Sequence, residues 1–407
     1  MYEEMVGDRP AGGFSHPTDQ EEKQMKNFTF HNPVKLVFGK GTIAELGNLV
    51  PKGARVLMTY GGGTIKKIGV YDQVKAALAG VDWMEFGGIE PNPQYDTLMR
   101  GVELARKNNR DFLLAVGGGS VLDGAKFMAA AIPFKGPNAW DIMEGKAPIE
   151  IALPVGCVLT LPATGSEMNR YAVVSRHDTG QKTVINHEKL LPVFSILDPQ
   201  TTYSLPPRQV SNGIVDTWMH VVEQYLTYPL DTPLQDRQAE AILQTLLEEA
   251  PKVLKNPHDY NVRANLMWCA TMAFNGLLNC GGISDWTSHR VGHELTALYG
   301  IDHGQSLAVL FPAVLRHQKA DKMDKLIQYG RRVFGIQGTP EKTAELAIEK
   351  TAEFFRSIGM KTKLSEYGIP PADYPKIADK LQLRGKLGER QNIGVKEVME
   401  ILALTEA

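Results

Sequence analysis

Short apolar runs alternate with helix-length segments between residues 34 and 205 of this 407-residue chain. The apolar runs are each five residues long: Val34–Phe38, Arg55–Thr59, Asp82–Phe86 and Phe112–Val116. The segments with a helical period are Thr42–Val50, Ile68–Leu78 and Thr97–Asn108. Strands that alternate with helices form βαβ units, in which the helix carries the chain back so that successive strands run parallel. This half therefore predicts an α/β fold with a parallel sheet.

The sequence changes character after Leu205-Pro206-Pro207, where β-branched runs become rare. The helical segments expected there are Gln209–Tyr225, Pro233–Lys255, Asp259–Leu277, Trp286–Tyr299, Ser306–Lys319, Ala320–Phe334 and Pro340–Ile358, and the remaining tail also has a helical pattern. We therefore expect an α/β domain over residues 25–205 and an all-helical domain over residues 206–407.

Residues 1–24 carry six acidic and two basic side chains among several Pro and Gly residues. This composition predicts a disordered acidic tail, and the segment lacks the apolar core of a signal peptide. The chain has 44 basic and 46 acidic residues, so its formal charge of −2 gives no reason to expect nucleic acid or an anionic membrane as a partner. Three widely spaced cysteines suit a reducing compartment, and we expect a cytoplasmic protein.

The sequence GGGS at residues 117–120 follows the strand Phe112–Val116 and precedes a helix over Val121–Ala131. Glycine lets backbone N–H groups approach an anion, and a helix N-terminus adds unsatisfied donors and a positive dipole end. The motif matches neither G-x-G-x-x-G nor the P-loop. It favours a phosphate site, while a tight turn without a ligand stays the alternative.

Two further loops have small and hydroxyl residues after an apolar run. The loop YGGGT at residues 60–64 precedes Lys66 and Lys67 and contains no acid that would hold ribose hydroxyls. Two lysines beside glycines would suit a 2′-phosphate, although surface lysines after a turn are also common. The loop at residues 160–167, TLPATGSE, suits phosphate or ribose contacts, but its composition is also that of an ordinary loop.

Four histidines and one aspartate fall at spacings typical of a metal site. Asp216 and His220 lie four residues apart, as do His289 and His293, and His303 follows a turn. The i,i+4 spacing places both members of a pair on one face of a helix. Mixed carboxylate and imidazole ligands suit Fe(II), Zn(II) and similar ions. The pattern is not that of HExxH proteases, and G-x-S-x-G is absent from the sequence.

The motifs AVGGGSVLDGAKF and TLPATGSEMN, together with the Asp/His spacing, resemble the iron-containing (group III) alcohol dehydrogenase family. YGGGTIKKIGVYDQV, FGGIEPNP and LPPRQVSNGIVD resemble its branch of NADPH-preferring aldehyde reductases and butanol dehydrogenases. The resemblance extends from about Met25 to the C-terminus. It implies a two-domain architecture, shared with dehydroquinate synthase, in which a Rossmann-like α/β domain and an all-α domain enclose a metal.

The resemblance also implies roles for individual positions. The implied metal ligands are Asp216, His220, His289 and His303. The implied cofactor contacts are Gly62, Thr64, Lys67, Gly117, Gly118, Gly119, Ser120, Asp123, Thr160, Leu161, Thr164 and Lys182. His293 matches a histidine near the active site that does not bind the metal, and we expect it to pass a proton. Gly62 stands where NAD-preferring members carry an aspartate, which favours NADP(H) over NAD(H) because a carboxylate would repel a 2′-phosphate.

The expected activity is hydride transfer between NAD(P)H and a small aliphatic aldehyde or primary alcohol such as butanal or butanol, assisted by one Fe²⁺ or Zn²⁺ ion. Trp218 and Trp286 near the predicted ligands favour an apolar substrate pocket. The alternatives are an enzyme like dehydroquinate synthase or glycerol dehydrogenase, and a non-catalytic metal- or nucleotide-binding protein. A homodimer is expected from the resemblance alone.

Overall fold

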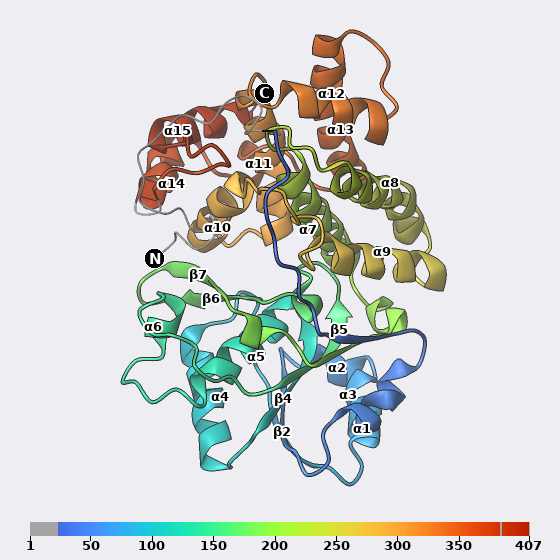
Figure 1. Ribbon diagram of the computed structural model, residues 1–407, viewed down its shortest axis with the longest axis vertical. Helices are drawn as coiled ribbons and strands as arrows, with labels where there is room; N and C mark the ends of the chain where they lie inside the picture. The colour runs from blue at the N-terminus through green and yellow to red at the C-terminus, as the bar shows by residue number, and fades with distance from the viewer. Residues whose placement is uncertain (1–22, 383–384, 407) are drawn as a thin grey trace.

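The computed structural model describes residues 23–382 and 385–406 and has a part with a parallel sheet and a part made of helices (Figure 1). All but the last two residues of the predicted disordered tail, residues 1–24, lie outside the described residues. The described chain begins on the helical part, where Lys26 N–H donates to the carbonyl of Gly281 at 2.9 Å. The proposed domain boundary at residue 205 stays a prediction, although the large sheet lies entirely before it.

The large sheet has six strands in the order β1-β8-β5-β4-β2-β3, and every neighbouring pair is parallel. The strands are β1 (Lys35–Phe38), β2 (Arg55–Tyr60), β3 (Asp82–Phe86), β4 (Phe112–Gly118), β5 (Val155–Leu161) and β8 (Phe194–Leu197). The predicted parallel sheet is therefore confirmed.

Helices cover both faces of this sheet: α1 (Leu46–Leu49), α2 (Thr64–Lys67), α3 (Val70–Ala77), α4 (Tyr95–Lys107), α5 (Gly119–Ala131) and α6 (Trp140–Met143). Alternate residues of β4 enter two different cores. Phe112 and Leu114 pack with α1 and α3, whereas Leu113 and Ala115 pack with α4 and α5. Burial on both faces explains why the strand reads as a continuous apolar run.

The connections after β2 and β4 leave the sheet in opposite directions. From β2 the chain passes through α3 to β3, and from β4 it passes through α5 to β5 on the other face. Adjacent strands whose connections diverge leave a crevice at their carboxyl ends, where α/β proteins bind ligands. The two glycine loops, residues 61–63 and 117–119, lie at this crevice.

A two-stranded antiparallel sheet, β6 (Tyr171–Arg176) with β7 (Gln181–Asn186), follows β5. The sequence pattern had not predicted these strands. In Figure 1 the hairpin lies at the boundary between the two parts, where β6 packs on α5 and β7 contacts α10. It therefore forms one wall of the space between the sheet and the helices.

The second part contains α7 (Pro207–Tyr225), α8 (Pro233–Lys255), α9 (Tyr260–Ala273), α10 (Thr287–Tyr299), α11 (His303–His317), α12 (Met323–Val333), α13 (Pro340–Ser357), α14 (Tyr374–Leu381) and α15 (Val395–Leu404). Helix α7 is buried on all sides from Val210 to Tyr225. A helix buried all round lies at the centre of a helical core, so α7 holds its polar residues away from bulk water. None of the helices in the described part of the chain combines the length and the apolar character that a membrane span requires.

Candidate metal centre and nucleotide cleft

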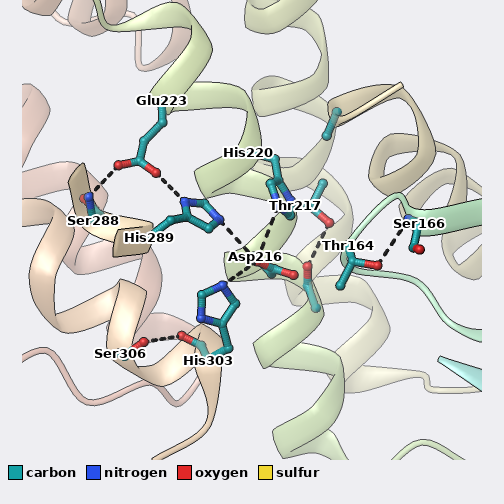
Figure 2. A network of polar contacts seen from close by, with 12 residues as sticks. Thr164, Ser166, Asp216, Thr217, His220, Glu223, Ser288, His289, His303 and Ser306 are labelled. Atoms are coloured by element: carbon teal, nitrogen blue, oxygen red, sulfur yellow. Dashed lines mark hydrogen bonds and ion pairs between the residues drawn. The ribbon is translucent and has the colours of Figure 1, made fainter. Parts of the chain in front are cut away.

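Three helices bring the predicted metal ligands together (Figure 2). Asp216 and His220 lie one turn apart on α7, His289 comes from the first turn of α10, and His303 is the first residue of α11. The Nε2 atoms of His289 and His303 each lie 3.7 Å from Oδ1 of Asp216, and that of His220 lies 3.9 Å from it. His293, the remaining histidine of the predicted set, has its ring centroid 5.2 Å from that of His303.

The chemistry of this cluster fits a divalent cation. Oδ1 of Asp216 and Nε2 of His289 are buried and have no hydrogen-bond partner among the described residues. Such atoms are costly to bury unless something else satisfies them. Donor atoms of Asp216, His289 and His303 lie within 4.8 Å of one another. Ligand atoms at about 2.1 Å from a tetrahedral ion are about 3.4 Å apart, so these three donors would have to move closer together around an ion. His220 is outside this group of three, with its Nε2 3.9 Å from Oδ1 of Asp216.

Glu223 is a functional candidate that the sequence pattern had not identified. Its carboxylate accepts hydrogen bonds from Nδ1 of His289 and, at 2.7 Å, from the backbone N–H of Ser288. Because Nδ1 is engaged by Glu223, Nε2 is the ring nitrogen that faces Asp216 and can bind a cation. Glu223 lies seven residues after Asp216, on the same face of α7, and this i,i+4,i+7 spacing was the available signal.

His303 is positioned by close contact between α11 and α7. The cap residue Asp302 accepts a hydrogen bond from Nδ2 of Asn212 at 2.6 Å, and its backbone N–H donates to Gln305 at 3.1 Å. A Cβ atom at Gly304 would lie 2.7 Å from the backbone of Asn212. A glycine after His303 therefore allows the two helices to approach closely enough to complete the cluster.

The histidines differ in their protonation equilibria. Burial lowers the pKa of His220 to about 4 and holds that of His303 well below its usual value. Burial alone would also lower the pKa of His289, but the Glu223 and Asp216 carboxylates raise it to about 9. The same carboxylates that favour a proton on His289 also favour a cation, so metal and proton compete for Nε2.

The glycine turn and the cluster open onto one cavity of about 1950 Å³, which is large enough for a dinucleotide and a small substrate. The turn has close neighbours: a Cβ atom at Gly119 would lie 2.5 Å from the side chain of Thr164, and one at Gly118 would lie 3.0 Å from Leu161. Among the described side chains, none caps the N-terminus of α5. The first N–H groups of this helix are thus available to an anion.

Most of the predicted cofactor residues line this cavity: Gly62, Thr64, Gly117, Gly118, Gly119, Ser120, Asp123, Thr160, Leu161, Thr164 and Lys182. Lys67 is described by the structure but is not one of the residues that line the cavity. Its contact with a cofactor stays a prediction. Lys66, beside it, makes an ion pair of 3.2 Å with Glu85. Lys182 donates to Oδ1 of Asn92 at 2.9 Å, which ties β7 to the loop that precedes α4.

Both carboxylate oxygens of Asp123 accept hydrogen bonds from protein groups. Ser166 donates through Oγ at 2.6 Å, and the backbone N–H of Val173 donates at 3.1 Å. Asp123 therefore connects the start of α5 to the loop at residues 160–167 and to β6. This structural role is compatible with a place on the cavity wall, and a direct contact between Asp123 and the cofactor stays a prediction.

The two predicted pocket tryptophans have different environments. Trp286 lines the cavity, with ring centroids 5.1 Å from Phe274 and 5.2 Å from His289. Trp218 is fully buried in the helical core, 4.8 Å from Phe354. The apolar wall near the cluster is thus formed by Trp286 and Phe274, and Trp218 contributes to stability.

An enzyme that transfers hydride needs a dinucleotide beside a group that polarises the substrate, because protein side chains supply no hydride. A cleft with an anion-binding turn and an Asp/His cluster fits a metal-dependent oxidoreductase. The family model "Iron-containing alcohol dehydrogenase" matches residues 33–199, and "Fe-containing alcohol dehydrogenase family, C-terminal" matches residues 210–405. The chain belongs to the iron-containing alcohol dehydrogenase family.

Individual relatives agree with this assignment. The chain is 52% identical over 374 residues to the NADPH-dependent aldehyde reductase YqhD of Escherichia coli, covering 91% of this chain and 97% of the relative. It is 40% identical over 384 residues to the probable NADH-dependent butanol dehydrogenase 1 of Bacillus subtilis, covering 93% and 99%. The crystal structure of E. coli YqhD superposes with a TM-score of 0.92 at 49% identity, covering 94% of this chain and 100% of the other. The predicted family branch and fold class are confirmed.

Proposed function

We propose that this protein is a metal-dependent aldehyde reductase that transfers hydride from NADPH to a small aliphatic aldehyde such as butanal, and in reverse oxidises a primary alcohol such as butanol. The observation that carries the proposal is that the glycine turn and the Asp/His cluster open onto one cavity. The names of the E. coli and B. subtilis relatives, an aldehyde reductase and a probable butanol dehydrogenase, support the reaction class.

In this proposal Asp216, His220, His289 and His303 hold one divalent ion, Fe²⁺ or Zn²⁺. The ion, when bound, supplies Lewis-acid polarisation of the substrate oxygen. Glu223 holds Nδ1 of His289, so that Nε2 is the nitrogen that faces Asp216 and would bind the ion. The rings of Phe274 and Trp286 keep bulk water from the cluster, which strengthens every electrostatic interaction there.

The cofactor pyrophosphate is proposed to bind at Gly117, Gly118 and Gly119, with further contacts from Thr160, Leu161, Thr164 and Lys182. NADPH is proposed as the preferred dinucleotide because Gly62 leaves open space on the wall, where a Cβ atom would meet nothing within 4 Å. A Gly62→Asp variant should therefore lose preference for NADPH over NADH, because its carboxylate would repel a 2′-phosphate. An unchanged ratio of kcat/KM for the two cofactors would remove Gly62 from the proposal.

His293 is proposed to pass the proton that the alcohol oxygen gains or loses. It lines the cavity next to His303 and is thus within reach of solvent in the cleft. General acid–base groups with a pKa near the working pH impose a bell-shaped or sigmoidal pH dependence on the rate. His293→Ala should change the pH–rate profile, and an unchanged profile would assign the proton to water or to the cofactor ribose.

A homodimer in the cytoplasm completes the proposal. The edge strand β1 ends in exposed Phe38, and Phe28 and Phe30 are exposed on the segment that precedes it. Unpaired strand edges and exposed aromatic side chains are typical of surfaces that a second copy covers. Light scattering during size-exclusion chromatography measures the mass directly, and a monomer at micromolar concentration would contradict this part.

The central experiment follows the oxidation of NADPH in the presence of butanal by the full chain loaded with Fe²⁺ or Zn²⁺. Turnover that a chelator abolishes and that metal restores supports the proposal. Metal-loaded protein that binds NADPH without turning over any aldehyde would favour a non-catalytic binding protein. In the reverse assay, oxidation of glycerol with NAD⁺ or NADP⁺ by a protein that does not reduce butanal would favour the glycerol dehydrogenase alternative.

A further inference from the structure

Trp286 has a backbone conformation that is unfavourable for its side chain. Its φ of 62° and ψ of 13° lie in the left-handed region, at the residue that precedes the first turn of α10. The other non-glycine residues with positive φ in the described chain are Asn92, Asn109 and Gln391, all with polar amide side chains. Bulky residues are true outliers in this region, and such strain persists only where the surrounding structure enforces it.

A buried ion pair next to Trp286 supplies that enforcement. Asp285 places Oδ2 2.9 Å from Nζ of Lys322 and accepts the backbone N–H of Thr287 through Oδ1 at 3.0 Å. Its own N–H donates to the carbonyl of Glu223 at 2.8 Å. Lys322 is 2% exposed and also contacts Glu389 at 2.7 Å. Asp285 and Thr287, the residues on both sides of Trp286, are therefore held by contacts that do not involve the Trp286 side chain.

The enforced conformation directs the indole ring into the cleft. The ring makes edge-to-face contacts with Phe274, His289 and His220, at centroid distances of 5.1, 5.2 and 6.2 Å. Two of these partners are proposed metal ligands, and the third stacks flat on His220 at 4.6 Å. Trp286 is partly exposed, and its free surface belongs to the cavity wall.

We infer that Trp286 determines the chain length of the substrate by limiting the space beside the cluster to a short, unbranched aliphatic group. A substrate oxygen at the cluster has the glycine turn and its cofactor on the sheet side of the cavity. The indole ring lines the cavity directly beside the cluster, 5.2 Å from the ring of His289, so it takes up space that the carbon chain of a longer substrate would need. This inference rests on the proposed function and concerns the same site.

The test compares kcat/KM for butanal and octanal in wild type, Trp286→Ala and Trp286→Phe. The expected result is a rise of about tenfold or more in the octanal-to-butanal ratio for W286A, since two or more buried methylenes become accommodated, and a smaller rise for W286F. Trp268→Ala is the matched control, because Trp268 is exposed on α9 and contacts Phe38 far from the cleft. An unchanged ratio in W286A with wild-type metal content would overturn the inference.

Trp286→Gly tests the backbone part of the inference separately. Glycine adopts positive φ without strain, so W286G should shift the substrate ratio as W286A does but have a higher Tm than W286A. A Tm equal to or below that of W286A would show that the conformation is not strained, and would overturn the role of the Asp285–Lys322 pair. Turnover of butanal by the wild type tests the proposed function alone, so failure there is distinguishable from failure here.

Discussion

Nδ1 of His289 donates a hydrogen bond to the carboxylate of Glu223, and Nε2 of the same ring lies 3.7 Å from Oδ1 of Asp216. The two carboxylates, both on α7, therefore act on opposite nitrogens of one imidazole from α10. A carboxylate behind a ligating histidine fixes the ring orientation and makes the facing nitrogen more basic. Because Glu223 also accepts the N–H of Ser288, it fixes the first turn of α10 as well.

Glu223→Gln should lower the affinity for the divalent ion by roughly 10- to 100-fold, the usual effect of losing such a partner. The glutamine can present only one acceptor oxygen, so the hydrogen bond from either His289 or Ser288 is lost. Metal analysis after dialysis against graded chelator measures the change. Glu240→Gln is a matched control, because Glu240 is a buried carboxylate on α8 whose partners are Tyr225, Gln328 and Arg332. Equal metal loss in both variants would contradict a specific role for Glu223.

Gly119→Ala should raise the KM for NADPH by about tenfold or more while the metal content stays unchanged. The new Cβ would lie 2.5 Å from the side chain of Thr164, so the turn or the loop at residues 160–167 must move away from its position. A movement of about 1 Å at a phosphate site misaligns several N–H donors at once. Initial-rate kinetics with varied NADPH at saturating aldehyde measures the effect.

A second glycine variant controls for the general cost of an added methyl group. A Cβ at Gly282 would have its nearest contact at 3.7 Å, which is an ordinary van der Waals distance. Gly282→Ala should therefore leave the KM for NADPH unchanged. If G119A also had a wild-type KM, the pyrophosphate would have to bind elsewhere in the cleft.

The sequence predicted those parts of the site that depend on local spacing. Asp216 and His220 share a helix face, and the turn at residues 117–119 follows its own strand, so a few neighbouring residues define each feature. Glu223 was also on that face, but its role depends on contact with His289, 66 residues later. Sequence spacing gives no information about which helix packs against which, so this partnership needed the folded structure.

The two tryptophans show that the sequence also does not predict which apolar side chains line the cavity. Trp218 lies two residues from a predicted ligand and Trp286 lies three, yet Trp218 is in the core of the helical part and Trp286 lines the cavity. The unpredicted β6–β7 hairpin brought Val173 to Asp123, which gave that carboxylate a structural partner. Tertiary packing decides which side chains face a cleft, and this cannot be predicted from residue type or from helical periodicity.

Lys126 gives a prediction about pH that concerns stability. It is fully buried on α5, and its Nζ donates to the carbonyls of Asn169 and Tyr171 at 2.8 and 3.0 Å. Burial lowers the pKa of Lys126 to about 8, from 10.5 for an unperturbed lysine. Between these values the unfolded chain holds a proton that the folded chain has lost. The contribution of Lys126 to the free energy of unfolding should therefore rise with pH, by up to about 1.4 kcal/mol per pH unit.

A comparison with Lys126→Met isolates this contribution, because the other titrating groups are present in both proteins. The free energy of unfolding of the wild type minus that of K126M, measured by urea denaturation, should increase between about pH 7.5 and about pH 10. Lys107→Met, an exposed lysine at the end of α4, tests whether loss of any positive charge has this effect. If the difference in free energy of unfolding between wild type and K126M stays constant over this range, Lys126 keeps its proton in the folded protein. In that case the three oxygen acceptors of Asn169 and Tyr171 outweigh the effect of burial on the pKa of Lys126.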